Sequence, residues 1–481
     1  GTIGVSTGKW YFEFTQSSGT YAQAVGIKSS AAQDNNNNYF YTGHTGQKVN
    51  ASGTASSYGA TWGNNDVIGV AFDLDAGTIT FYKNGTSQGQ AFSGITDATY
   101  FPYVTGWSGG TWGGFVNFGA RPFAYTPPSN HLPLVTTNLT DPTIEDGSTA
   151  MDVALWTGTG ATRSITGLGF SPDFVWIKKR SGTTAHNLFD IVRGANKPLF
   201  SNLTNAELSD GRLTAFNSDG FTLDSDNAVN DNNQTHVGWA WDGGTTTATN
   251  TDGSITSNVR ANQSAGFSIV TYEADAPNNV IGHGLNAEPY FAITKARDRT
   301  DNWLVYHYDL GVNKWLHLNL SSAVVTTSGI WGTASNWTNS TFGVSTSSIE
   351  GNNYGSHDYV AYCWAPVAGY SAFGSYTGNG SSDGPFVFTG FRPRFVFVKR
   401  TDSAGENWWV KDTARSPYNP MPETLFPSTS DAEISNQTAR YYDFISNGFK
   451  LRGTDTGSNA SGGTYVYAAF AEHPFKTSRA R

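Results

Sequence analysis

The stretch from Asp66 to Gly85, DVIGVAFDLDAGTITFYKNG, constrains the fold of this chain more than any other feature. Its apolar residues alternate with period two, as side chains on one face of a β-strand do: Ile68, Val70, Phe72, Leu74, Ile79 and Phe81. The pattern predicts an antiparallel pair with Leu74 opposite Ile79 and Phe72 opposite Phe81. The closing Asn-Gly tolerates the positive φ angles of a hairpin turn, so we expect a third strand after it.

Composition favours an all-β protein with aromatic cores. The 481 residues include 55 Gly, 15 Trp, 23 Tyr and 30 Phe, and only 14% are charged, whereas helical proteins are richer in Ala, Leu, Glu and Lys. The net charge of −9 argues against nucleic-acid partners, because phosphates are bound by stripes of Lys and Arg. No run of about twenty apolar residues exists, so we expect no membrane insertion. The single cysteine, Cys363, excludes an internal disulfide and is expected to fill a small space in a core.

Short strand motifs follow one another through the first part of the chain. They are GKWYFEF, VGI, YG-x-x-W-x-x-x-DVIGVAFDLDAGTITFYKNG, YFPYV and VNFGARPF. In order and spacing they resemble the SPRY domain family over nearly all of residues 5 to 128. The resemblance implies a bent antiparallel β-sandwich that binds partners through loops at one edge and has no catalytic activity as such. Because the loops are rich in Asn, Ser and Gly, the residues of the family's known peptide-binding pockets cannot be matched to positions in this sequence.

The remainder of the chain contains three related segments. Pro172, Pro289 and Pro393 each precede an apolar strand, and they lie 117 and 104 residues apart (289 − 172 and 393 − 289). Each segment ends in a strand of small and aromatic residues, HVGWAWD, YVAYCWA or YVYAAFA, which is apolar on both faces and therefore predicted to be central in its sheet. At this spacing each segment is a small domain that could bury its own core.

We therefore predict an all-β chain in which a SPRY-like antiparallel β-sandwich is followed by three related β-sandwich-like repeat domains. The expected divisions are 1–128 for the SPRY-like sandwich, 129–148 for a linker, 149–245 for the first repeat, 246–263 for a second linker, 264–367 for the second repeat and 368–481 for the third. The second and third repeats almost touch, which predicts a stiff junction between them.

A SPRY-like unit followed by such repeats, with phrases such as SPDFVWIKKR, SDGFTL and a closing AAFAEHPFKTSRAR, is similar to virion proteins of tailed bacteriophages, tail-fibre-like proteins among them. The resemblance implies a place on the exterior of the phage particle, on the tail or the capsid, and contact with other virion subunits. It also implies a homo-oligomer, with a trimer favoured for a fibre. The chain begins at Gly1 and not at a methionine, which leaves open a missing N-terminal portion with an anchoring segment.

No motif points to catalysis. A G-x-S-x-G nucleophile elbow is absent from the sequence, and the nine His residues are scattered. The acidic candidates for glycosidase chemistry are Glu13, Asp73, Asp75, Glu273 and Glu406, which the sequence does not pair and which we expect in turns or in solvent. Asp73-x-Asp75 lacks the other acidic residues of a calcium loop, and GTGATR at 158–163 lacks the Lys of a phosphate loop. We expect no enzyme, no cofactor and no metal site.

The three repeats share a lysine six positions after the proline: Lys178, Lys295 and Lys399. One interpretation is a repeated anion site. The interpretation we favour is that these strand-end lysines protect a sheet edge or lay their apolar stems over the sheet.

Aromatic residues in loops are the candidate ligand-binding residues: Trp107, Trp112, Tyr39, Tyr41, Trp331 and Trp337. The first two lie in GWSGGTWGG, where glycines leave little around each ring, and the last two lie in GIWGTASNWTN. An aromatic face beside Asn and Ser side chains can stack on a sugar while the polar groups bind its hydroxyls. The alternative is that these rings cap the ends of the sandwich or fill subunit contacts.

The leading hypothesis from sequence is therefore an exposed bacteriophage virion protein, a tail fibre or related adhesin, that binds host surface material such as a glycan or a protein. Two alternatives stay open. One is a structural protein that decorates capsid or tail without binding a receptor, and the other is a polysaccharide depolymerase.

Overall fold

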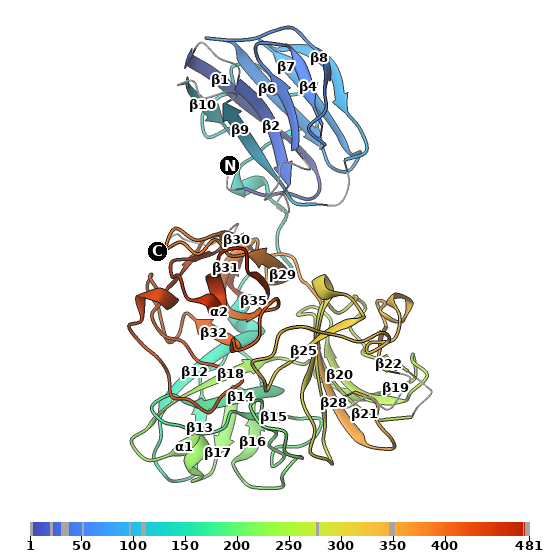
Figure 1. Ribbon diagram of the computed structural model, residues 1–481, viewed down its shortest axis with the longest axis vertical. Coiled ribbons are helices and arrows are strands. Elements are labelled where there is room, and N and C mark those ends of the chain that lie inside the picture. The colour runs from blue at the N-terminus through green and yellow to red at the C-terminus, as the bar shows by residue number, and fades with distance from the viewer. Residues whose placement is uncertain are drawn as a thin grey trace. The chain divides into compact units, whose positions relative to one another are not determined.

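The computed structural model describes residues 3–19, 23–29, 38–50, 52–95, 98–106, 112–275, 279–345, 352–474 and 476. Contacts divide the chain into two compact units, Gly1–Asp141 and Pro142–Arg481. Both are built almost entirely of antiparallel β-sheets, as composition and strand periodicity predicted (Figure 1). In the part of the chain that the structure describes, no helix has the length and apolar character needed to cross a membrane.

The first unit is a sandwich of two sheets. One sheet has the order β10 (Trp112–Asn117), β1 (Lys9–Gly19), β6 (Val67–Asp73), β7 (Thr78–Lys83) and β8 (Thr86–Phe92), and β11 (Leu132–Pro133) pairs in parallel with β1. The other has the order β5 (Ala55–Ser57), β4 (Gln47–Val49), β3 (Asn38–Thr42), β2 (Gln23–Ser29) and β9 (Tyr100–Gly106). Alternate residues of β1, such as Trp10 and Phe12, meet Val25 and Ile27 of β2 in the core between the sheets.

The hairpin of β6 and β7 forms where the sequence predicted it, but its register differs from the prediction. Phe72 lies opposite Ile79, and Val70, not Phe72, lies opposite Phe81. The turn comprises residues 74–77, and the Asp73 carboxylate fixes it by accepting hydrogen bonds from the backbone N–H groups of Asp75 (3.1 Å) and Ala76 (2.9 Å). The next turn is the predicted Asn-Gly, with φ of 47° and 78°, and it leads into β8.

Residues 129–148, expected to be a linker, are divided between the two units. β11 adds to β1 and Leu134 is buried in the sandwich core, so the first unit continues beyond residue 128 to Asp141. The 3-10 turn η2 (Gly147–Thr149) belongs to the second unit, where Gly147 lies too close to the Ala471 carbonyl to carry a Cβ.

The second unit contains three sheets that share one strand order. In the first repeat the order is β12 (Met151–Thr157), β18 (Thr235–Trp241), β14 (Phe174–Lys179), β15 (Asn187–Asp190). In the second it is β21 (Phe267–Glu273), β28 (Asp358–Trp364), β23 (Phe291–Ala296), β24 (Leu304–His307), and in the third β29 (Ser371–Thr377), β35 (Thr464–Pro474), β31 (Phe391–Arg400), β32 (Trp409–Asp412). The last strand of each repeat lies between two others, which confirms its predicted central position.

Further elements extend or cover these sheets. The sheet of the second repeat continues through β20 (Ser257–Asn262) to β19 (Thr247–Asn250) on one side and through β25 (Lys314–His317) to β26 (Val325–Thr326) on the other. Residues 246–263 are thus not the loose linker we expected.

Three smaller sheets accompany the main ones. The first consists of β13 (Arg163–Thr166), β17 (Gly220–Leu223) and β16 (Leu213–Asn217), the second of β22 (Val280–Gly282) and β27 (Thr341–Gly343), and the third of β30 (Phe386–Phe388), β34 (Gly448–Leu451) and β33 (Tyr442–Ile445). The short helical turns are α1 (Asn227–Asn230), α2 (Thr456–Asn459), η1 (Thr136–Asn138), η3 (Tyr308–Leu310), η4 (Ala334–Asn336) and η5 (Thr438–Arg440).

The three repeats share a single aromatic core. The Trp241 ring of the first repeat contacts Trp364 of the second, with centroids 6.1 Å apart, and Phe395 and Phe470 of the third, at 5.6 and 5.7 Å. The repeats therefore form one compact body, whereas the sequence spacing had suggested that each buries a core of its own. The first and second repeats do each keep a second apolar cluster on the far side of their sheets.

Hydrogen bonds at equivalent positions close the three repeats into a ring. The last residue of the fourth strand contacts the next repeat in each case: Asp190 accepts from the Tyr362 hydroxyl (2.7 Å), His307 Nε2 bonds the Tyr467 carbonyl (3.1 Å), and Asp412 accepts from Trp239 Nε1 (3.0 Å). The residue four positions before each of these strand ends forms a side-chain hydrogen bond with the preceding repeat. Trp303 bonds the Phe200 carbonyl (2.8 Å), Trp408 bonds the His317 carbonyl (2.7 Å) and His186 bonds the Phe426 carbonyl (3.1 Å). Each repeat is thus held by both of its neighbours.

Candidate functional site

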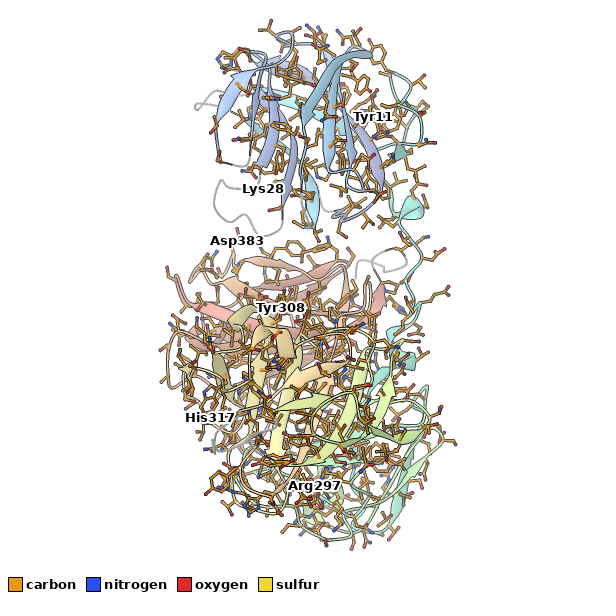
Figure 2. All side chains as sticks on the ribbon, turned by 90° about the vertical axis from the view of Figure 1, so that its right-hand side faces the viewer. Tyr11, Lys28, Arg297, Tyr308, His317 and Asp383 are labelled. Atoms are coloured by element: carbon orange, nitrogen blue, oxygen red, sulfur yellow. The ribbon has the colours of Figure 1, made fainter. Side chains whose placement is uncertain are left out.

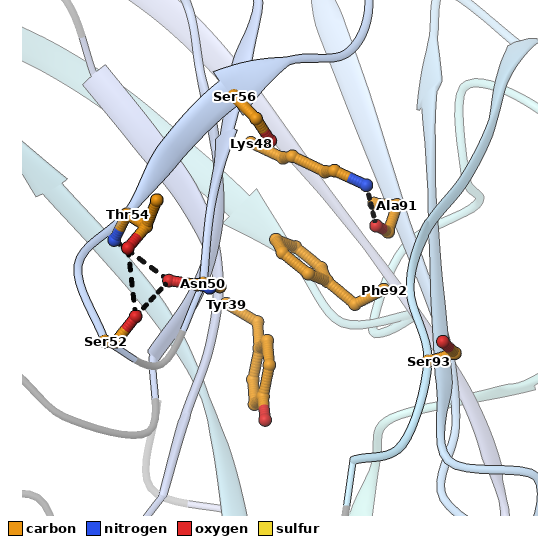
Figure 3. A pocket seen from close by; sticks show the side chains of 9 residues that line it. All are labelled: Tyr39, Lys48, Asn50, Ser52, Thr54, Ser56, Ala91, Phe92 and Ser93. Carbon is orange, nitrogen blue, oxygen red and sulfur yellow. Dashed lines mark hydrogen bonds between the residues drawn. The ribbon is translucent and has the colours of Figure 1, made fainter.

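A pocket of about 420 Å³ opens on the first unit, between the edges of its two sheets (Figure 3). The strand β5 ends one sheet and β8 ends the other, so the pocket occupies the open side of the sandwich. Nine residues line it: Tyr39, Lys48, Asn50, Ser52, Thr54, Ser56, Ala91, Phe92 and Ser93. Its volume lies within the range of small-ligand sites.

The polar wall of the pocket is a turn between β4 and β5 that is fixed by its own side chains. Asn50 Oδ1 accepts hydrogen bonds from the Ser52 hydroxyl and from the backbone N–H of Thr54, both at 2.9 Å (Figure 3). Gly53 permits the turn with a φ of 75°. The sequence Asn-Ala-Ser-Gly-Thr therefore builds a turn that presents hydroxyl groups on an exposed edge.

The inner part of the pocket is aromatic. Tyr39 from β3 and Phe92 from the end of β8 meet edge to face, with centroids 5.1 Å apart and an interplanar angle of 65°. Phe92 is buried and Tyr39 is half-buried, and burial raises the pKa of the Tyr39 hydroxyl. The pair offers a ring surface next to the hydroxyls of the polar wall, an arrangement that suits a sugar.

Lys48 is the charged residue of the pocket. Its ammonium group reaches from β4 across to the Ala91 carbonyl at the end of β8 (Figure 3). The group also lies 5.5 Å from the Phe92 ring centroid and 5.8 Å from that of Tyr58. Lys48 therefore bridges the two sheet edges and places a positive charge beside the aromatic surface.

The structure places the predicted aromatic residues in different surroundings. Tyr39 lines the pocket. Trp112 is 41% exposed at the start of β10 and contacts the Phe14 ring edge-on, with centroids 6.5 Å apart, but it is not among the residues that line the pocket. Trp107 lies outside the described residues.

Tyr41, Trp331 and Trp337 were predicted as ligand-binding residues and are instead buried. The Tyr41 hydroxyl donates to the Ala60 carbonyl inside the sandwich. Trp337 stacks on Tyr306 with centroids 3.6 Å apart and donates to the Trp331 carbonyl (3.0 Å). The Gly- and Asn-rich segment around these tryptophans suggested exposure, but the segment folds back over the sheet of the second repeat, and its rings complete an apolar cluster there.

The repeated lysines form no exposed anion site, and they do not protect a sheet edge, because each lies on an inner strand. Lys178, Lys295 and Lys399 have fully buried side chains on inner strands. Each donates to the carbonyl of the following residue, at 2.6, 2.7 and 2.8 Å respectively. Burial lowers the pKa of all three to about 8. Their common role is to hold the backbone at the end of the strand.

Two of the acidic residues considered for catalysis, Glu13 and Asp73, have structural partners. Glu13 is buried and accepts from the backbone N–H groups of Ala124 (2.8 Å) and Tyr125 (2.9 Å), which fastens the segment after β10 to the sandwich. Asp73 pairs with Lys9 at 2.8 Å besides holding its own turn. Within the described ranges, no group of three or more His, Cys, Asp or Glu side chains is placed to hold a metal ion.

Lys48, Asn50 and Phe92 were not predicted from the sequence as ligand-binding residues. The polar turn that carries Asn50 was visible as a Ser- and Gly-rich segment. No local pattern shows, however, that β5 and β8 end their sheets side by side, because that placement follows from the strand order of both sheets.

Comparison with known proteins agrees with this division of the chain. The family profile described as "Domain of unknown function (DUF7483)" matches residues 146–474. The chain belongs to this family. The SPRY domain profile matches residues 3–112, and the N-terminal unit is a SPRY domain, as its motifs suggested.

Curated relatives resemble short stretches of the chain. An E3 ubiquitin-protein ligase, RKP, of Arabidopsis thaliana is 34% identical over 131 residues, which is 24% of this chain and 10% of the relative. A probable ATP-dependent RNA helicase, ddx1, of Dictyostelium discoideum is 34% identical over 102 residues (21% and 13%). Ran-binding protein 10 of Danio rerio is 36% identical over 109 residues (22% and 17%). The chain thus spans less than a fifth of the length of these relatives.

Solved structures that match the chain include the SPRY domain of human HERC1, with 20% identity, 24% of this chain and 80% of that chain covered, and a TM-score of 0.23. A second is a human SPRY domain with 18% identity, 25% and 84% coverage, and a TM-score of 0.20.

Proposed function

We propose that this protein is an exposed component of a bacteriophage virion, a tail fibre or related adhesin, and that its SPRY domain binds a host-surface glycan in the pocket between β5 and β8. The observation that carries the proposal is the composition of this pocket. Two aromatic rings lie beside an amide and several hydroxyls on an open sheet edge. Sugars are bound by this combination, because their C–H faces stack on rings while their hydroxyls exchange hydrogen bonds with short polar side chains.

The build of the pocket supports binding of a ligand from solution. Ser56 and Thr54 are exposed, whereas Phe92 is buried and held by the sandwich core. The polar wall needs little ordering on binding, because Asn50 already fixes its turn. The hydroxyls are therefore available to a ligand without loss of packing.

The proposed location of the protein on a virion is supported by a sequence resemblance. The SPRY motifs followed by aromatic repeats are similar to virion proteins of tailed bacteriophages. The ring of three repeats suits a rigid support, since each repeat is joined to both others by buried side chains. A trimer of whole chains remains part of the proposal. Its contacts must use other surfaces, because the equivalent faces of the repeats are already occupied within one chain.

A second candidate function is a structural one, in which the protein decorates a capsid or tail. Large apolar side chains on the surface of the second unit favour it, among them Tyr418 (75% exposed), Phe386 and Tyr308, which is labelled in Figure 2. Such residues are suited to contacts with other virion subunits.

The test is a matched pair of tryptophan substitutions on β5. Ser56→Trp fills the pocket, whereas Ser57→Trp places the same ring on the opposite face of the same strand. Binding of the purified full chain to host cells, and its inhibition of phage adsorption, should be lost with Ser56→Trp and kept with Ser57→Trp. Wild-type protein that neither binds host cells nor inhibits adsorption would contradict the proposed function.

A further inference from the structure

We propose that the glycan bound in this pocket is acidic, and that Lys48 binds the carboxylate of a uronic acid or a sialic-acid-type sugar. This inference rests on the proposed glycan-binding function and narrows it from glycans in general to sugar acids.

Two lysines of the SPRY domain are neutralised by neighbouring carboxylates. Lys9 pairs with Asp73 at 2.8 Å, and Lys83 pairs with Asp66 at 3.3 Å. Lys28 makes no ion pair with a carboxylate of the described residues but does not line the pocket, and Lys48, which does line it, makes none either. Its partner is the neutral carbonyl of Ala91, which occupies one of the three N–H donors of the ammonium group. Two donors remain for a ligand.

The surroundings of the Lys48 ammonium strengthen its attraction for an anion. The Lys48 ammonium is half-buried and lies against the rings of Phe92 and Tyr58. Solvent screens a charge less in such a place than on an open surface, so that a ligand anion is attracted more strongly. The bond to Ala91 fixes the ammonium at the pocket and lowers the entropic cost of binding.

The charged and polar groups of the pocket suit a carboxylate better than a phosphate or sulfate. Lys48 is the only cationic side chain among the nine lining residues, and none of them is Arg. Phosphate and sulfate groups are typically bound by several N–H donors or by bidentate guanidinium groups. A single ammonium suits a carboxylate with its single charge. The hydroxyls of Ser56 and Ser93 remain to bind ring hydroxyls, which makes the ligand a sugar acid and not a bare anion.

The experiment measures binding of monosaccharides to the full chain by ligand-observed NMR. The probes are D-glucuronate, D-galacturonate and N-acetylneuraminate, each compared with its uncharged counterpart: D-glucose, D-galactose and the methyl ester. Lys48→Met removes the ammonium, and Lys48→Arg restores a charge. Lys28→Met is the matched control, because Lys28 also lies over a ring, that of Tyr103 at 5.3 Å, but does not line the pocket.

The wild-type protein should bind at least one acid about tenfold more tightly than its uncharged counterpart, as expected for a hydrogen bond to a charged group. Lys48→Met should abolish this preference, added salt should weaken it, Lys48→Arg should restore part of it, and Lys28→Met should leave it unchanged. Circular dichroism of each variant checks the fold.

Three outcomes would overturn the inference. In the first, neutral sugars bind as tightly as the acids and Ser56→Trp abolishes their binding, which would support glycan binding in the pocket but contradict the preference for acidic sugars. Acetate or sulfate that binds as tightly as the sugar acids would show a bare anion site. If no probe binds the wild-type protein in a manner that depends on Ser56, both the inference and the proposed glycan site fail.

Discussion

Trp239 of the first repeat donates its indole N–H to the Asp412 carboxylate of the third repeat, at 3.0 Å, in a wholly buried position. This bond joins parts of the chain that are 173 residues apart and completes the ring of the three repeats. Arg415 holds the same carboxylate through its Nε (2.5 Å) and also reaches Glu433 (2.9 Å). The bond is therefore one member of a buried charged network, not an isolated contact.

Trp239→Phe should destabilise the second unit by roughly 1.5–3 kcal/mol, because a buried carboxylate loses a hydrogen bond. The measurement is urea unfolding followed by circular dichroism. Trp156→Phe is the matched control, since Trp156 donates to the neutral Val229 carbonyl (3.1 Å) within the first repeat, and it should cost roughly 1 kcal/mol. A control variant that is destabilised as much as Trp239→Phe would contradict a special role for the bond across repeats.

Arg193→Met should destabilise the second unit by about 3–5 kcal/mol, because it leaves Asp190 buried without its cation. Arg193 also bonds Glu207 (2.9 Å) and the Tyr362 hydroxyl of the next repeat (3.1 Å). Arg440→Met breaks the partly exposed pair with Asp455 and should cost roughly 1 kcal/mol or less. Similar unfolding midpoints for the two variants would show that burial of the Arg193 network contributes little.

Acid should weaken the ring of repeats. Burial lowers the pKa of His186 and His307, and it lowers that of His283 to about 4. Below the unfolded value of about 6.5 the unfolded chain binds more protons than the folded chain, so that stability falls as pH falls from there toward the folded pKa. Each such histidine contributes up to about 1.4 kcal/mol per pH unit.

The check is urea unfolding at a series of pH values from 7.5 downward. His307→Gln should flatten the pH dependence, because Gln cannot take up a proton. His131→Gln, in the first unit, should not change the pH dependence of the second unit. Equal slopes for wild type and His307→Gln would contradict the assignment.

The ring should survive a cut in the chain. A protease site inserted after Asp252, in the exposed turn between β19 and β20, allows cleavage of the folded protein. The two fragments should stay together in gel filtration, since the first repeat is joined to the second through Tyr362 and to the third through Asp412. Fragments that separate without denaturant would show that chain continuity, not packing, holds the repeats.

The sequence predicted the β-strands, the Asn-Gly turn, the SPRY domain and the central position of the last strand of each repeat. It also predicted the burial of Cys363, which has no exposed surface. These features depend on local patterns, because side chains in a strand alternate with period two and because few residues tolerate positive φ.

The tertiary structure decided the rest. The turn of the first hairpin is fixed by hydrogen bonds of the Asp73 side chain, and the burial of Trp331 and the three repeat lysines follows from segments that fold over their sheets. Lys48 and Phe92 meet because two sheet edges lie side by side. Local periodicity tells which residues share a face. Packing between distant segments determines what covers that face, and therefore which side chains remain free to bind.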